Sequence, residues 1–175
     1  DDSVLRQTSA RLPWLLIGML GGIGNSMILG NFDTTFAAHP EMALYIPLIG
    51  GTGGNVGTQS SALVVQGLAN SSLDANNTWK QILKESVVAL INATIISMLV
   101  YIYNFVRFGP TATVSYSVSL SLFAVVMFAS IFGTLVPMTL EKLKIDPAIA
   151  TGPFISITND IIGMMLYMGI TVLLS

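Results

Sequence analysis

The sequence contains long apolar stretches that carry almost no charge, and the last of them constrains the fold most. Between Pro147 and Ser175 the only charged side chain is Asp160. A helix rises about 1.5 Å per residue, so Asp160 would lie roughly 20 Å from either end of a helix over this stretch. Such a helix can cross a hydrocarbon core of about 30 Å. The stretch therefore predicts a membrane span with a carboxyl group near its midplane.

A carboxylate at that depth costs about 2.5–3.5 kcal/mol on insertion scales and normally faces water or a partner. No Lys, Arg or His occurs in the middle of another apolar stretch, so the chain offers no buried cationic partner. These observations predict an ion site at Asp160. The alternative is a protonated carboxyl group that only hydrogen-bonds a neighbouring helix.

The composition supports an integral membrane protein of the multi-pass type. Hydrophobic residues make up 53% of the chain and charged residues 9%, against about 25% charged residues in soluble domains. With no cysteine, disulfides, thiolate chemistry and cysteine metal sites are excluded. No basic patch suggests nucleic-acid binding. An enzyme is not expected, because no second carboxylate lies at catalytic spacing near Asp160.

We expect an all-α fold with five transmembrane helices. In the first span, Pro13 suits the first helical turn, and Gly18 with Gly22 would allow close helix contact. Asn25 and Ser26 of the same span are expected to form interhelical hydrogen bonds. The predicted spans cover residues 12–32, 42–73, 86–106, 114–140 and 147–175.

The second span contains a glycine-rich stretch that predicts an interrupted helix. After Pro47, five glycines occur within the eight residues 50–57, which disfavours a regular helix. In lipid, broken backbone is tolerated where protein buries it or water lines it, and transporters use such half-helices at ion sites. Asn55, Thr58 and Gln59 favour a wet face. The alternative is that the glycines serve tight helix packing. The stretch is not a phosphate-binding loop, since no Lys follows the glycines.

The distribution of basic residues predicts the topology. Five spans place the two termini on opposite sides, and the positive-inside rule then puts the N-terminus in the cytosol and the C-terminus outside the inner or plasma membrane. The loop with His39 and Glu41 would be solvated, because one His and one Glu make a weak metal site. Only Arg107 lies on the outer side, and the basic residues on the N-terminal side are Arg6, Arg11, Lys80, Lys84, Lys142 and Lys144.

The sequence resembles the membrane domain of MgtE magnesium channels over about residues 11–175. The run Arg11-Leu-Pro-Trp-Leu-Leu, the Gly-Gly-Asn-x-Gly-x-Gln core within residues 47–59, and Asp146-Pro-Ala with the later Asp160 carry this resemblance. It implies a homodimer with a pore along its two-fold axis, lined mainly by the second and fifth spans. Asp160 of each subunit would form the central magnesium site. The resemblance places these further residues along the pore: Gly51, Asn55, Thr58, Ala62, Gly152 and Ser156.

The resemblance also implies a domain division. Residues 1–11 would be a cytosolic lead-in, either on the membrane surface or as the end of a linker helix from a regulatory region of the same protein, and residues 12–175 the five-span pore domain. The spacing of 152, 156 and 160 puts these positions on one helical face, as does that of 51, 55, 58 and 62.

The first functional hypothesis is a channel that conducts hydrated Mg²⁺, the bound and transported ion, through a dimeric pore with Asp160 at its centre. An alternative is a secondary transporter that exchanges Mg²⁺ for H⁺ or Na⁺. A third hypothesis is a non-transporting membrane scaffold whose glycines serve assembly.

Overall fold

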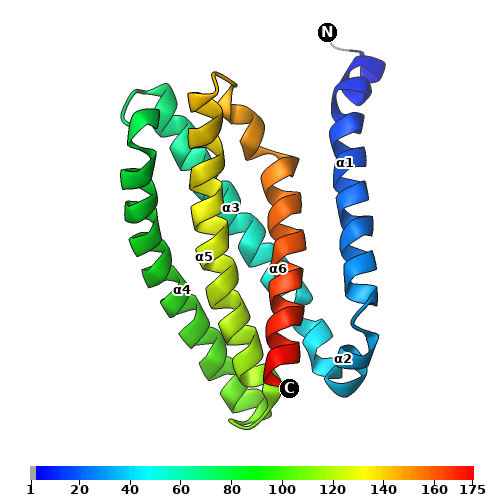
Figure 1. Cartoon of the computed structure of the whole chain (residues 1–175). Helices are drawn as coiled ribbons and strands as arrows, with labels where there is room; N and C mark the ends of the chain where they lie inside the picture. Colours follow the sequence, from blue (N-terminus) through cyan, green and yellow to red (C-terminus); the bar gives the residue numbers. More distant parts are fainter. Residues whose placement is uncertain (1–2) are drawn as a thin grey trace.

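Long helices account for nearly all of the fold, and residues 3–175 are described by a computed structural model (Figure 1). The 3₁₀ helices η1, η2 and η3 occur in the connections between longer helices. The elements in chain order are α1 (Val4–Gly30), α2 (Asp33–Ala38), η1 (Pro40–Tyr45), α3 (Ile46–Ala69), η2 (Ala75–Asn77), α4 (Thr78–Phe108), α5 (Thr113–Lys142), η3 (Pro147–Thr151) and α6 (Pro153–Leu174).

Within the described residues 3–175, four helical segments are long and apolar enough to cross a membrane: Val4–Gly30, Ala75–Phe108, Thr113–Lys142 and Pro153–Leu174. The chain is thus a multi-pass, all-helical membrane protein. Helix α3 has 24 residues, which is sufficient length, but its Gly, Ser, Thr, Asn and Gln residues make it less apolar. The predicted fifth crossing at α3 therefore stays a prediction.

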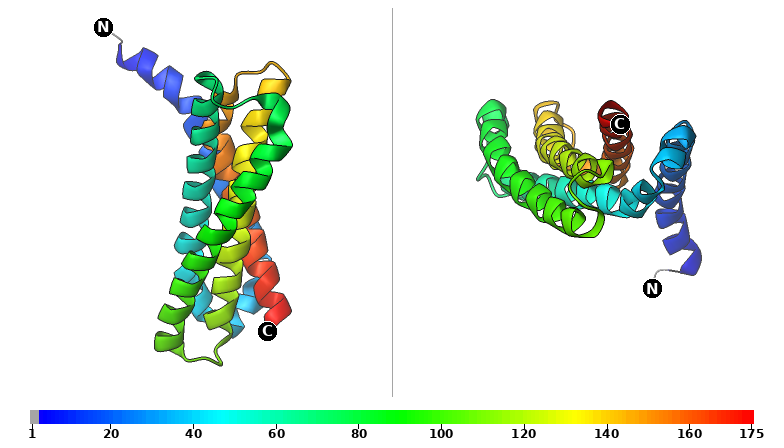
Figure 2. Two further views of the ribbon diagram at one scale, coloured as in Figure 1. Left: turned by 90° about the vertical axis from the view of Figure 1, so that its left-hand side faces the viewer. Right: turned by 90° about the horizontal axis from the view of Figure 1, so that it is seen from below.

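Helix α5 is the centre of the bundle. It packs against α4 on one side and against α3 and α6 on the other. A core cluster of buried residues lies where η1, α3, α5 and α6 meet and includes Met42, Ile49, Leu122, Val125 and Tyr167. Helix α1 packs on α6 at the edge of the bundle (Figure 2) and has no buried residue. It begins at the end of the bundle opposite to the one where α6 ends (Figure 1).

The predicted interruption of the second span is wrong, because α3 is a continuous helix through the glycine-rich stretch. Gly53 and Gly57 are buried there. A Cβ at Gly53 would lie 2.8 Å from Cγ1 of Val125 on α5, and one at Gly133 of α5 would lie 2.7 Å from the carbonyl oxygen of Gly57. The glycines therefore bring the backbones of α3 and α5 together, and this close packing outweighs their low helix propensity.

Helix α1 also departs from the prediction at its start. It begins at Val4 rather than at residue 12, and the Ser3 hydroxyl caps it by accepting a hydrogen bond from the Arg6 N–H at 3.2 Å. Pro13 is therefore inside the helix, where it removes a backbone donor, and the first turns bend away from the bundle in Figure 2. A Cβ at Gly18 or Gly22 would meet no atom within 4 Å, so no helix of residues 3–175 packs closely on this pair.

Candidate cation site

A cavity of about 380 Å³ surrounds Asp160 between α1, α3 and α6. Helix α6 supplies Asp160 and, one turn earlier, Ser156. Helix α3 supplies a glycine face and the amide of Asn55, while α1 adds Asn25. The polar and glycine residues around the cavity are Asn25, Gly50, Gly51, Gly54, Asn55, Ser156 and Asp160.

The Asp160 carboxylate lies over the bare backbone of α3. A Cβ at Gly50 would be 3.4 Å from Oδ1 of Asp160, and one at Gly54 would be 3.9 Å away. No basic side chain of residues 3–175 forms an ion pair with Asp160. The Asp160 carboxylate therefore lies next to the cavity without a basic partner among the described residues. At Gly50 and Gly54, which face this carboxylate, α3 contributes only backbone atoms.

Asn159, the neighbour of Asp160, faces away from the cavity. It is 1% exposed, and its side chain packs on Gly57, where a Cβ would overlap the amide. Neither amide atom has a hydrogen-bond partner among the residues that the structure describes. Asn159 is thus a helix-packing residue, which agrees with its offset of about 100° from Asp160 around the helix.

The structure brings four of the predicted site residues to one cavity: Gly51, Asn55, Ser156 and Asp160. Thr58 and Ala62 do not line it. They continue the exposed face of α3 that begins at Gly51 and Asn55. Gly152 lines a separate cavity of about 240 Å³, together with Trp14 and Thr151.

The sequence analysis missed Asn25, Gly50 and Gly54 as neighbours of Asp160. Gly50 and Gly54 directly precede Gly51 and Asn55 in the chain and are themselves four residues apart, which could have indicated a shared face. Asn25 was expected to form an interhelical hydrogen bond. Instead its Oδ1 atom is buried and has no partner among residues 3–175. Within residues 3–175 the expected bond does not form at this oxygen, because the facing wall of α3 is mainly glycine and the Asn55 amide does not donate to it.

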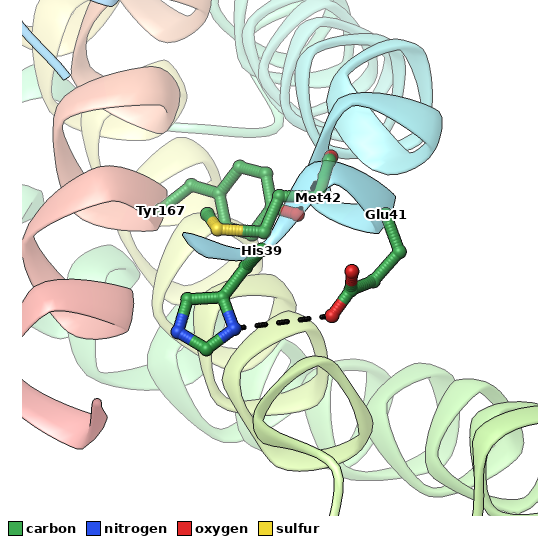
Figure 3. A network of polar contacts seen from close by, with 4 residues as sticks. All are labelled: His39, Glu41, Met42 and Tyr167. Atoms are coloured by element: carbon green, nitrogen blue, oxygen red, sulfur yellow. Dashed lines mark hydrogen bonds and ion pairs between the residues drawn. The ribbon is translucent and has the colours of Figure 1, made fainter. Parts of the chain in front are cut away.

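The loop predicted to be solvated is held in place by the contacts in Figure 3. Nδ1 of His39 lies 3.9 Å from Oε1 of Glu41. The buried Tyr167 hydroxyl of α6 donates a hydrogen bond of 2.9 Å to the Met42 carbonyl oxygen. No group of three or more His, Cys, Asp or Glu side chains that could hold a metal occurs in the described part of the chain. These contacts fix η1, and with it the start of α3, against α6.

The groups around the cavity suit a hard cation that keeps its water. One carboxylate, two amides and a hydroxyl offer oxygen atoms, the ligands that Mg²⁺ prefers. They are too few and too neutral to replace a full coordination shell. Such a cavity can contact a hydrated divalent cation through its water molecules.

Comparisons with known proteins agree with this chemistry. A family model described as MgtE, divalent cation transporter, matches residues 46–170. The chain is 33% identical over 160 residues to a magnesium transporter MgtE of Bacillus subtilis, covering 91% of this chain and 35% of that protein. It is 33% identical over 165 residues to a magnesium transporter MgtE of Thermus thermophilus, covering 94% and 36%. A third relative with the same name, from Enterococcus faecalis, is 30% identical over 170 residues, covering 97% and 37%. The chain spans about a third of the length of the curated relatives it matches.

Proposed function

This chain belongs to the MgtE family of divalent cation transporters, and from that premise we propose that it conducts hydrated Mg²⁺ across the membrane. One observation carries the proposal. The carboxylate of Asp160 borders a cavity between three helices and has no basic partner among residues 3–175. A bound cation would supply the positive charge that balances this carboxylate.

The proposed pore requires a second copy of the chain. In the single chain, Gly51, Asn55, Thr58 and Ala62 form an exposed stripe along α3. An amide and a hydroxyl on this stripe would face hydrocarbon, where unsatisfied polar groups are costly. A two-fold partner over the same face would enclose a wet path lined by α3 and α6. Two Asp160 carboxylates would then offset the two positive charges of Mg²⁺.

The mechanism follows from the hydration of Mg²⁺. This ion is small and gives up its water reluctantly. A pore that contacts the hydrated ion through its water molecules attracts it without stripping the shell, and the ion leaves readily because no inner-shell bond must break. The glycines next to Asp160 leave room for that shell.

The proposal includes the membrane topology and the domain division. Helix α3 would be the fifth crossing, with its polar stripe on the pore and its buried glycines against α5. Residues 12–175 would form the pore domain, and residues 1–11 the cytosolic lead-in. The ends of α4 and α5 that carry Lys80, Lys84 and Lys142 would then lie on the cytosolic side.

Flux into liposomes tests the proposal. We expect purified protein to let Mg²⁺ into liposomes with a magnesium-sensitive dye, and Asp160→Asn, which keeps the shape but removes the charge, to abolish most of the flux. Glu141→Gln is the matched control, since Glu141 is exposed at the end of α5. Equal flux through wild type and Asp160→Asn would contradict the central role of Asp160.

Two further measurements address the finer parts of the proposal. A channel reverses at the potential set by the Mg²⁺ gradient alone, whereas an exchanger also responds to a H⁺ or Na⁺ gradient. A cysteine at Thr58, on the exposed stripe of α3, should cross-link two copies in a membrane, and a cysteine at the lipid-exposed Val87 of α4 should not.

A further inference from the structure

Helix α1 stands in a fixed register beside α6. The two helices run in the same direction (Figure 1). Gly21 of α1 packs on Ile157 of α6, and a Cβ at Gly21 would lie 2.6 Å from Cγ2 of Ile157. One turn further along each helix are Asn25 and Asp160. The contact between Gly21 and Ile157 thus places the amide of Asn25 at the level of the Asp160 carboxylate, and both residues line the same cavity.

The side-chain oxygen of Asn25 is a hydrogen-bond acceptor whose donor is missing among the described residues. Its Oδ1 atom is buried and finds no donor among residues 3–175. The α3 wall of the cavity presents Gly50, Gly51 and Gly54, which have no side-chain donor, and neither the Asn55 amide on α3 nor the Ser156 hydroxyl on α6 donates to the Asn25 oxygen. Buried acceptors normally have partners, and a water molecule in the cavity can donate a hydrogen bond to Asn25 from this position.

We infer that Asn25 contacts the water shell of the transported cation, so that α1 forms a third wall of the ion path. The Asn25 Oδ1 atom accepts a hydrogen bond from a metal-bound water molecule, whose protons are strongly polarised by the divalent ion. This inference rests on the proposed function, because it requires a hydrated divalent cation in the cavity at Asp160.

A neutral amide suits this position for a physical reason. It orients one water molecule of the shell but adds no charge to the site. A second carboxylate on α1 would hold the ion more strongly and slow its release, and conduction needs binding weak enough for the ion to leave. Asn25 would thereby tune how long the ion stays, while Asp160 supplies the attraction.

The test measures Mg²⁺ binding apart from transport. The melting temperature of the purified full chain in detergent is recorded against Mg²⁺ concentration, and liposome flux is measured in parallel. Asn25→Ala should raise the half-saturating Mg²⁺ concentration about threefold to tenfold, the range expected for one lost hydrogen bond. Asn25→Asp should lower it and also slow the flux. The matched control is Ser26→Ala, at an exposed neighbouring position of α1, which should leave both values unchanged.

The outcomes separate this inference from the proposed function. If Asn25→Ala binds and conducts like wild type while Asp160→Asn has lost both properties, Asn25 is not an ion contact and the proposed function stands. If Asp160→Asn retains both, the proposed function fails, and the inference fails with it. If Asn25→Ala melts at a lower temperature without Mg²⁺, the isosteric Asn25→Asp decides: tighter Mg²⁺ binding supports the contact, and unchanged affinity overturns it.

Discussion

The side chain of Asn159 on α6 packs directly on Gly57 of α3, so that any Cβ at residue 57 would overlap the Asn159 amide. The same Cβ would lie 3.1 Å from Cγ2 of Ile155. This contact sets how closely α3 and α6 approach, and therefore the distance between the glycine face of α3 and Asp160.

Gly57→Ala should destabilise the protein, because the added methyl group forces α3 and α6 apart. Overpacking of a well-filled interior typically costs about 1–3 kcal/mol. Thermal denaturation in detergent would show this as a lower melting temperature. Gly22→Ala is the control, since a Cβ there meets no atom within 4 Å. A Gly57→Ala protein as stable as Gly22→Ala would mean that the contact between Gly57 and Asn159 is not tight.

Gly54→Ala should reduce transport without unfolding the chain. A Cβ at Gly54 would lie 3.8 Å from the Ser156 hydroxyl oxygen and 3.9 Å from Oδ1 of Asp160, which are ordinary contacts. The methyl group would instead occupy cavity space that a hydrated ion needs. We expect Mg²⁺ flux to fall about tenfold, the scale of one methyl group in a fitted pocket.

The control for this variant is Gly18→Ala on α1, where a Cβ meets no atom within 4 Å and which does not line the cavity. The melting temperatures of the two variants should match. Undiminished flux through Gly54→Ala would show that the cavity beside Asp160 is not the narrow part of the ion path.

Much of this architecture could be predicted from the sequence because the membrane imposes simple rules. Charge-free runs of sufficient length gave the apolar helices α1, α4, α5 and α6, and the lone charge in the last run pointed to Asp160. The glycine-rich stretch was wrongly predicted to interrupt the helix, because intrinsic helix propensity does not include packing against neighbouring helices. Gly53 and Gly57 are helical since Val125 and Asn159 pack against them.

The position of Asn25 could not be predicted in the same way. Its place beside Asp160 depends on the register between α1 and α6, which the packing of Gly21 on Ile157 sets. A sequence without its neighbours shows a polar residue in an apolar span, and an interhelical hydrogen bond is then the simplest interpretation. Only the three-dimensional arrangement shows that the facing wall of α3 is mainly glycine and that no side chain of residues 3–175 donates to the Asn25 oxygen.

Tyr167→Phe should destabilise the connection before α3. The Tyr167 hydroxyl is buried and donates to the Met42 carbonyl oxygen at 2.9 Å. Removing it leaves a buried carbonyl group without this donor, which costs about 1–3 kcal/mol. Hydrogen exchange of residues 40–47 should speed up, while Tyr101→Phe, at a more exposed position of α4, should leave it unchanged. Unaltered exchange in Tyr167→Phe would show that the core around Met42 holds η1 without this bond.

Removal of Mg²⁺ should destabilise the wild-type protein but not the Asp160→Asn variant. A ligand that binds only the folded state at about 100 times its dissociation constant stabilises that state by about 2.7 kcal/mol. Chelation with EDTA should therefore lower the melting temperature of wild type in detergent, and re-addition of Mg²⁺ should restore it. In Asp160→Asn the melting temperature should respond to neither step, because the carboxylate that attracts the ion is gone. A response of equal size in both proteins would place the stabilising ion elsewhere, with the paired His39 and Glu41 as the next position to mutate.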